Sequence, residues 1–140
     1  MGYISRQQYY QRAYVPDTAI VTSNDAEKKV LGLTYTLSKE ITLVAPIYSG
    51  SQLRVYYETK IDTPPNVVTS NIFRNGIAIG TERTNNTNGY IAYEEDLPTI
   101  GWKIGDKIQI WEYDTFIVLY AYCRNFRIKG VGSEFVNTVV

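Results

Sequence analysis

The chain has 140 residues, of which 44% are hydrophobic and 20% are charged, and this size and composition are typical of one folded domain. Its 14 basic and 14 acidic residues cancel, so we expect no nucleic-acid partner bound through phosphate neutralisation. The longest apolar run, residues 116–123, is far shorter than the roughly 20 residues of a membrane-spanning helix, which predicts no membrane partner.

The first 24 residues lack the periodicity of a core strand or helix. Four tyrosines alternate there with arginine and glutamine, and Pro16 then interrupts the chain. Tyrosine combines a large apolar ring with a polar hydroxyl, so it suits the rim of an interface. We predict an assembly arm over residues 1–24 that becomes ordered on a partner surface; the alternative is a frayed terminus. The arm tyrosines are Tyr3, Tyr9, Tyr10 and Tyr14.

The segment after the arm changes from a polar turn to a β pattern. Residues 24–30 could form one capped helical turn. Apolar side chains then alternate over residues 31–37, resume over 41–44 after a polar break, and alternate again over 53–61. The last stretch has the clearest period of two and predicts an antiparallel strand with one buried and one wet face. Its predicted buried side chains are Leu53, Val55, Tyr57, Thr59 and Ile61.

The strongest local signal is Asn75-Gly76 between two apolar runs. A type I′ turn needs positive φ at both central residues, and Asn and Gly tolerate it. Such a hairpin places Arg74 opposite Ile77 and Phe73 opposite Ala78.

Further strands are expected over residues 90–95, 107–113 and 117–128. The last of these runs does not keep one phase, because Arg124 would share a face with apolar side chains. A β-bulge over residues 123–125 would resolve this conflict.

About eight strands separated by turn signals, with no amphipathic helix, indicate an all-β fold. We predict a single antiparallel β-sandwich with jelly-roll wiring over residues 25–132, followed by a C-terminal tail over 133–140. A closed barrel is the alternative.

No catalytic, cofactor-binding or metal-binding residue can be assigned from the sequence, and we expect no small-molecule substrate. The chain has no histidine, which removes Ser-His-Asp and Cys-His arrangements. The single cysteine, Cys123, lies in an apolar run and is read as a small buried hydrophobe. Glu94, Glu95 and Asp96 form the one acidic cluster, but strand neighbours point to opposite faces and would not converge on a metal or a sugar. We therefore expect that the protein is not an enzyme.

Two tryptophans are the candidate surface-binding residues. Trp102 and Trp111 could form a sugar-stacking platform, although core and rim packing explains them as well. Trp111 alternates with Ile108 and Ile110, so it should face away from both.

Four segments carry a resemblance to a known family. They are Leu53–Lys60, Asn71–Glu82, Gly105–Trp111 and Ala121–Ile128, which supply a strand, an Asn-Gly hairpin, a Gly-Asp turn and a final strand. In this order they resemble small β-sandwich, jelly-roll-like virion proteins of tailed phages and archaeal viruses, including capsid decoration and tail-associated proteins. The resemblance implies symmetric assembly with copies of itself and with other virion proteins.

These observations together predict a viral structural protein. We expect a capsid decoration or minor capsid protein that self-associates symmetrically and docks through its arm. The alternatives are a tail or neck virion protein, or a carbohydrate- or receptor-binding β-sandwich module. The first residues lack the apolar core of a signal peptide, so we expect synthesis in the host cytoplasm and a final location in the virion.

Overall fold

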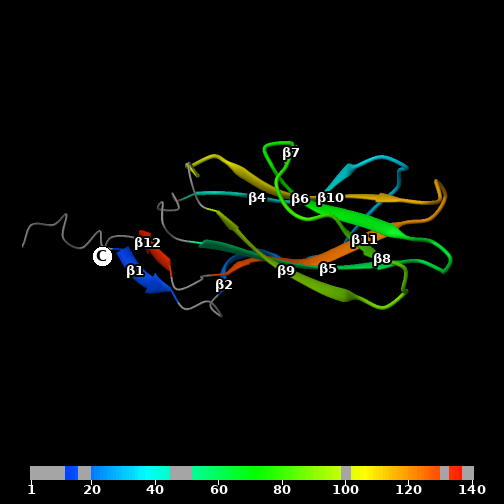
Figure 1. Ribbon diagram of the computed structural model, residues 1–140, viewed down its shortest axis with the longest axis horizontal. Helices are drawn as coiled ribbons and strands as arrows, with labels where there is room; N and C mark the ends of the chain where they lie inside the picture. Colours follow the sequence, from blue (N-terminus) through cyan, green and yellow to red (C-terminus); the bar gives the residue numbers. More distant parts are fainter. Residues whose placement is uncertain (1–11, 16–19, 45–51, 99–101, 130–132, 137–140) are drawn as a thin grey trace, which may run out of the picture.

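The computed structural model is an all-β sandwich of two antiparallel sheets, and it describes residues 12–15, 20–44, 52–98, 102–129 and 133–136 (Figure 1). The first sheet contains β4 (Thr36–Thr42), β6 (Val68–Arg74), β7 (Ile77–Ala78), β8 (Arg83–Asn85) and β10 (Lys107–Asp114). The second sheet contains β2 (Ile20–Asn24), β3 (Lys28–Val30), β5 (Gln52–Ile61), β9 (Ile91–Pro98) and β11 (Ala121–Lys129). None of the described segments forms a helix long and apolar enough to cross a membrane.

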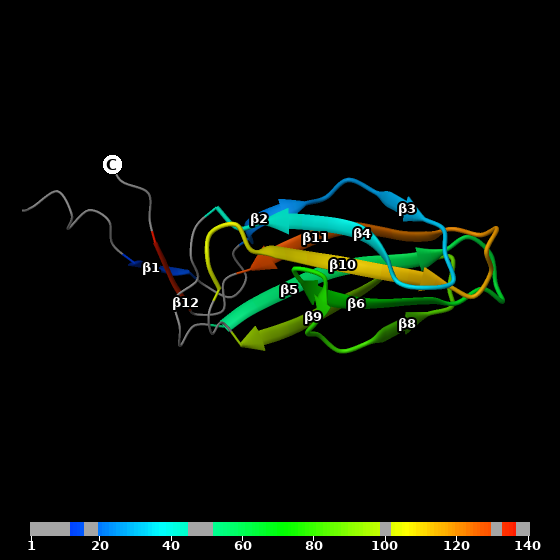
Figure 2. The same ribbon diagram turned by 90° about the horizontal axis from the view of Figure 1, so that it is seen from above.

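The strand order is that of a jelly roll, as predicted. The first sheet runs β4-β10-β6, with β7 and β8 pairing with successive parts of the free edge of β6. The second sheet runs β11-β5-β9, with β2 and β3 pairing with successive parts of β11. Counting each interrupted pair as one strand gives eight positions that form two four-stranded layers. Figure 2 shows the two layers lying over one another.

The alternation in β5 explains which of its faces is buried. Leu53, Val55 and Tyr57 point between the sheets and are almost fully buried, whereas Arg54 and Tyr56 face outward. Ile108 and Ile110 of β10 meet them from the first sheet. Each of these buried side chains contributes about 1.5–3 kcal/mol of transfer free energy, so the alternating strands supply most of the core.

Both predicted backbone irregularities are confirmed. Asn75 has φ of 49° and Gly76 has φ of 84°, and Phe73 pairs with Ala78 as a type I′ hairpin requires. In β11 the pairing with β5 shifts register between Arg124 and Arg127, and Asn125 has φ of 50°. This bulge returns Phe126 to the core at 0% exposure.

The sequence prediction for the segment before β5 is wrong in two respects. Residues 28–30 form β3 rather than a helical turn, and β4 begins only at Thr36, so Leu31 and Leu33 lie in an exposed connection. The predicted polar break falls inside β4, where Ser38 and Lys39 are buried. A register shift between β10 and β4 lets these two consecutive residues avoid the solvent.

The chain ends form a separate two-stranded ribbon. β1 (Arg12–Val15) pairs with β12 (Ser133–Val136), and Tyr14 lies opposite Glu134 (Figure 1). The sandwich also begins earlier than predicted, because β2 pairs with β11 although residues 20–24 were assigned to the arm. Tyr3, Tyr9 and Tyr10 lie outside the described residues.

Candidate functional site

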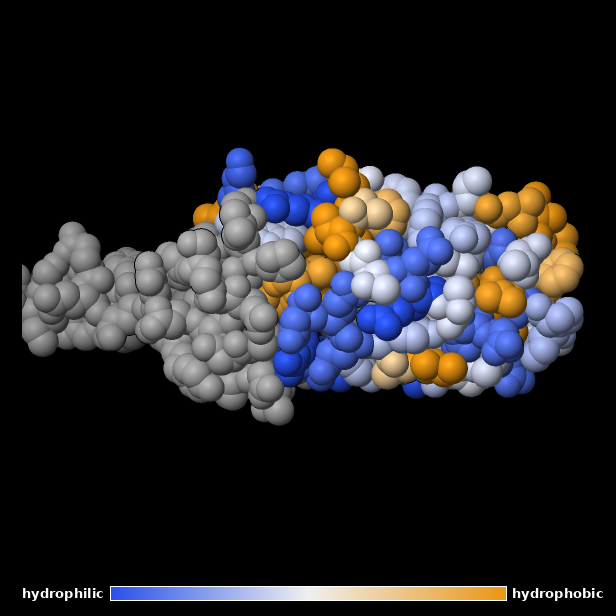
Figure 3. Space-filling model, viewed as in Figure 1, coloured by the Kyte–Doolittle hydropathy of each residue, from blue (hydrophilic) through white to orange (hydrophobic). Residues whose placement is uncertain are grey.

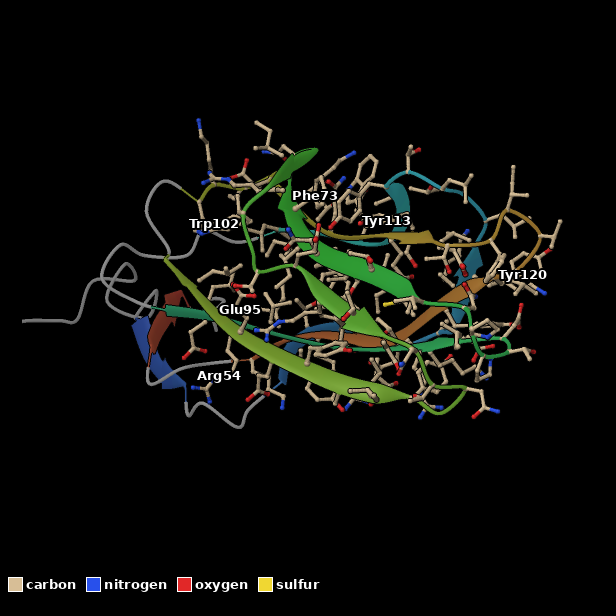
Figure 4. The ribbon with its side chains drawn as sticks, turned by 45° about the vertical axis from the view of Figure 1, so that its right-hand side comes forward. Arg54, Phe73, Glu95, Trp102, Tyr113 and Tyr120 are labelled. Atoms are coloured by element: carbon tan, nitrogen blue, oxygen red, sulfur yellow. The ribbon has the colours of Figure 1, made fainter. Side chains whose placement is uncertain are left out.

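Four aromatic side chains lie together on the outer side of the first sheet, and we call them the aromatic face. Phe73 and Trp111 are stacked, with ring centroids 5.1 Å apart and planes 26° apart. Tyr35 packs edge-on against Phe73 at 5.2 Å and against Tyr113 at 4.8 Å. Figure 4 shows Phe73 and Tyr113 close together on this sheet. The rings form a continuous apolar surface of limited extent.

Strand periodicity places three of the four rings. Trp111 and Tyr113 are two residues apart on β10, so both point away from Ile110 and the core. Phe73 comes from β6, and it pairs with Gln109 of β10. Trp111 and Tyr113 are partly exposed, whereas Phe73 is buried beneath its neighbours. Phe73 therefore supports the platform, and Trp111 and Tyr113 present it to solvent.

Polar side chains fix the rings at two places. Tyr35 lies in the β3–β4 connection, and its hydroxyl donates to Glu82 at 2.7 Å across the sheet. Burial and this carboxylate raise the pKa of Tyr35, so the hydroxyl stays a donor. The Trp111 indole N–H donates to Gln109 Oε1 at 3.0 Å, and the Gln109 amide donates in turn to Glu40 at 2.8 Å. The platform is therefore held in one arrangement.

Of the two tryptophans considered for a surface platform, only Trp111 lies at the outer surface. Trp102 is 5% exposed and belongs to the core, with the Arg74 guanidinium 4.2 Å from its ring centroid. Trp111 faces away from Ile108 and Ile110 as predicted. Tyr113 could have been found from its phase with Trp111. Tyr35 could not, because no local pattern shows that its connection folds over the sheet.

The neighbouring carboxylates of Glu94 and Glu95 point to opposite sides of the sheet, as strand geometry requires. The Glu94 carboxylate pairs with Lys129 at 2.8 Å on one side of the sheet, whereas Glu95 accepts from the Thr81 backbone N–H at 3.0 Å on the other. Asp96 pairs with Arg54 at 2.7 Å, and hydrogen bonds from this arginine lower the pKa of Asp96. Within the described ranges, no group of three or more acidic, cysteine or histidine side chains could hold a metal ion.

A hollow of about 420 Å³ lies beside the β6–β7 hairpin. Its lining combines an ion pair, Arg74 with Asp106 at 2.7 Å, with two apolar side chains of the hairpin. Asp106 also accepts from the Lys103 backbone N–H at 2.9 Å, the turn chemistry expected of aspartate. The lining residues are Arg74, Asn75, Ile77, Ile79, Lys103 and Asp106.

The sequence analysis missed Glu112, the most deeply buried acid among the described residues. Glu112 lies on the core face of β10 at 0% exposure, and neither carboxylate oxygen has a hydrogen-bond partner among the described residues. Burial raises its pKa to about 8. Cys123, buried as predicted, lies in the same core. Counting by two from Ile108 and Ile110 would have placed Glu112 inside.

Comparison with known proteins finds no matching family model and no matching curated protein. Loosely similar solved structures include the following three. The CBM22-1 xylan-binding domain of Xyn10C from Paenibacillus barcinonensis is 7% identical over 90% of this chain and 94% of that chain, with a TM-score of 0.46. A structure described as "CBM4 structure and function" is 15% identical over 80% of this chain and 77% of that chain, with a TM-score of 0.48.

The third structure is the CBM22-1-CBM22-2 tandem domain of the same Xyn10C, which is 7% identical over 94% of this chain and 46% of that chain, with a TM-score of 0.45. All three TM-scores lie below 0.5, so this likeness assigns neither a family nor a ligand to the chain.

Proposed function

We propose that this protein is a non-catalytic carbohydrate-binding β-sandwich module that stacks a sugar ring on the aromatic face. The observation that carries the proposal is the partly exposed Trp111 ring, backed by the stacked Phe73 and flanked by Tyr113. The C–H groups on one face of a sugar ring carry partial positive charge, and the face of an aromatic ring is negative. A preformed flat platform therefore gains contact area at little cost in side-chain entropy.

The groups around the rings add polar partners for hydroxyl groups. Glu82 accepts one hydrogen bond from Tyr35 and keeps lone pairs for another donor. Glu40 lies at the other side, bonded to the Gln109 amide and 3.5 Å from the Lys107 ammonium. Carboxylate and amide groups beside aromatic rings are suited to a neutral, hydroxyl-rich ligand.

Replacing Trp111 by alanine is expected to weaken glycan binding about 30-fold, because truncating a central aromatic anchor typically costs 2 kcal/mol or more. Tyr113→Ala should weaken it less, since that ring lies at the border of the platform. Binding would be measured by affinity electrophoresis and calorimetry with neutral soluble polysaccharides, including xylan, β-glucan and mannan.

The matched control is Phe116→Ala, which removes a 43% exposed aromatic ring from the β10–β11 connection instead. This variant should bind like the parent. The proposal fails if no glycan binds the parent, or if Trp111→Ala and Phe116→Ala lose the same affinity while keeping the parental melting temperature.

A second proposal, a structural role in a virus particle, rests on the terminal ribbon. Among the described strands, β1 pairs only with β12, outside both sheets of the sandwich. A two-stranded ribbon has two edges with unpaired backbone groups, and such edges can extend a sheet of a neighbouring subunit. The tyrosine-rich residues before β1 would then supply apolar anchors at that contact.

Deleting residues 1–15 is expected to leave the melting temperature of the sandwich unchanged while abolishing self-association. The deletion removes β1 but no strand of the two sheets. Light scattering and calorimetry on both chains provide the test. Equal mass for the full and shortened chains would refute arm-mediated assembly.

A further inference from the structure

We propose that the end of the sandwich formed by the β3–β4 and β10–β11 connections docks on an anionic lipid surface. Five large apolar side chains, which we call the apolar tip, are exposed there. Their exposed fractions are Leu31 43%, Leu33 54%, Phe116 43%, Ile117 65% and Val118 76%. Figure 3 shows apolar side chains gathered at this end of the molecule, and Figure 1 shows the terminal ribbon at the opposite end.

Charge is excluded from the segments that build this end. Residues 31–35, 63–67 and 115–120 contain no acidic or basic residue. The first and third of these segments lie side by side, because the Asp114 backbone N–H donates to the Gly32 carbonyl at 2.8 Å. The second segment, residues 63–67, is joined to the third because the Thr115 backbone N–H donates to the Val67 carbonyl at 3.2 Å.

A buried polar network holds the apolar tip in place. Asn66, which is 0% exposed, donates to the Asp114 carboxylate at 2.7 Å, and that carboxylate accepts from the Phe116 backbone N–H at 3.0 Å. The Leu119 N–H then closes a turn onto the Phe116 carbonyl. This turn displays Ile117 and Val118 at its outermost positions. The exposed apolar groups are therefore presented by a rigid base.

Tyrosine and lysine form the next layer behind the tip. Lys29 of β3 and Lys60 of β5 pair with Tyr122 of β11 from its two sides, so the three side chains form a row on one sheet face. The Lys60 ammonium lies 4.7 Å from the centroid of the Tyr122 ring. The Lys29 ammonium lies 4.5 Å from the centroid of the Tyr120 ring. Figure 4 places Tyr120 at this end and Trp102 at the opposite one.

These two lysines differ from three other basic residues of the same sheet, which form close ion pairs. Arg54, Arg124 and Lys129 are each within 2.8 Å of a carboxylate oxygen, whereas Lys29 and Lys60 form no ion pair within the described part of the chain. The nearby acids accept from tyrosines instead: Asp62 from the Tyr122 hydroxyl at 2.5 Å, and Glu27 from the Tyr90 hydroxyl. The Tyr122 hydrogen bond, and more weakly the Lys29 and Lys60 ammonium groups, lower the pKa of Asp62. Neither lysine forms an ion pair with this acid, so both ammonium groups can still contact lipid phosphates.

The order of the layers favours a bilayer over a protein partner. Apolar side chains, then tyrosines, then lysines is the sequence of depths at a membrane interface, where tyrosine lies at the headgroups and lysine reaches the phosphates. A stable protein interface uses about 20–30 residues a side, far more than the five of the tip. This proposal departs from the predicted absence of a membrane partner, which was argued from the lack of a spanning segment; surface attachment needs no such segment.

Flotation of the full chain with vesicles made of equal parts phosphatidylcholine and phosphatidylserine tests this proposal. We expect the parent to float with these vesicles and to bind pure phosphatidylcholine vesicles more weakly. Lys29→Ala with Lys60→Ala should partition about 30-fold less onto the anionic vesicles, since each lysine near the surface contributes about 1 kcal/mol. High salt should reduce binding of the parent in the same direction.

The decisive comparison uses two double variants that add the same charge. Ile117→Asp with Val118→Asp should abolish flotation. Val44→Asp with Ile104→Asp should leave it unchanged, because these side chains are 87% and 66% exposed at the opposite end of the sandwich. The proposal is overturned if the parent does not float, or if both variants float equally with parental melting temperatures. Neither result bears on glycan binding by the aromatic face.

Discussion

Replacing Glu112 by glutamine is expected to raise the free energy of unfolding by about 4 kcal/mol near pH 8 and to change it little near pH 4.5. The reason is the position of the carboxyl group inside the core. Glu112 is 0% exposed between the two sheets, and no described side chain or backbone group hydrogen-bonds either oxygen. An ionised carboxylate in such a place loses its hydration without compensation.

The groups around Glu112 do not neutralise it. Burial raises the pKa of Glu112 by more than Ser38 of β4 lowers it. The ammonium of the neighbouring Lys39 donates to the Ala26 carbonyl instead. The carboxyl of Asp114, on the same strand, adds negative charge that raises the pKa of Glu112 further. Across the core, Cys123 of β11 is buried, and burial raises the pKa of its thiol, so the thiol stays neutral. Ser70, opposite Glu112 on β6, bonds the Tyr57 hydroxyl of β5 at 3.0 Å.

The direction of the pH dependence follows from the two pKa values of Glu112. In the unfolded chain the carboxyl releases its proton near pH 4.5, whereas in the folded protein it keeps the proton up to about pH 8. Between these values the folded state binds more protons than the unfolded state, so the stability of the parent falls as the pH rises. Glutamine cannot ionise and removes this loss.

Urea unfolding of parent and Glu112→Gln at several pH values from about 4.5 to about 8 measures the effect. The difference between the two proteins isolates this group, because the other acids are common to both. Glu94→Gln is the control, since its carboxylate lies at the surface and its replacement should change the stability little. A constant difference between parent and Glu112→Gln would show that the carboxyl is not buried.

Local chemistry explains why much of the fold was predictable. The Asn75-Gly76 turn, the alternation in β5 and the bulge near Asn125 each depend on a few neighbouring residues. The exposed connection over residues 31–35 was taken for a strand because Leu31 and Leu33 alternate with small residues. Those leucines point into solvent at the apolar tip, so their pattern reflects a surface and not a core.

The candidate sites were predicted less well because they depend on contacts between distant segments. Trp111 was identified from its phase, but Tyr35 reaches the aromatic face only through a hydrogen bond to Glu82, 47 residues away. The sequence left the place of Trp102 open between surface and core, because nothing in its local pattern shows that it joins the core beside Arg74. Composition identified the aromatic side chains, and only the packing of the sheets showed which of them reach the surface.

Replacing Asn66 by alanine is expected to lower the free energy of unfolding by about 3 kcal/mol near pH 7. Asn66 is fully buried, donates to Asp114 at 2.7 Å and accepts from the Thr115 hydroxyl at 3.0 Å. Alanine leaves the Asp114 carboxylate, 2% exposed, without this donor. Urea unfolding of Asn66→Ala provides the measurement, with the exposed Asn88→Ala as the control that should stay within about 0.5 kcal/mol of the parent.

Acidification should distinguish a lost charge interaction from a simple packing defect. Burial raises the pKa of Asp114 above its usual 3.8, and losing the Asn66 donor raises the pKa further. The folded variant then binds a proton more readily than the folded parent, so its deficit in stability is largest near pH 7 and shrinks as the pH falls toward 4. A cavity left by the amide would cost the same at every pH. A pH-independent deficit would therefore show that Asn66 fills space at the base of the apolar tip and does not stabilise the Asp114 charge.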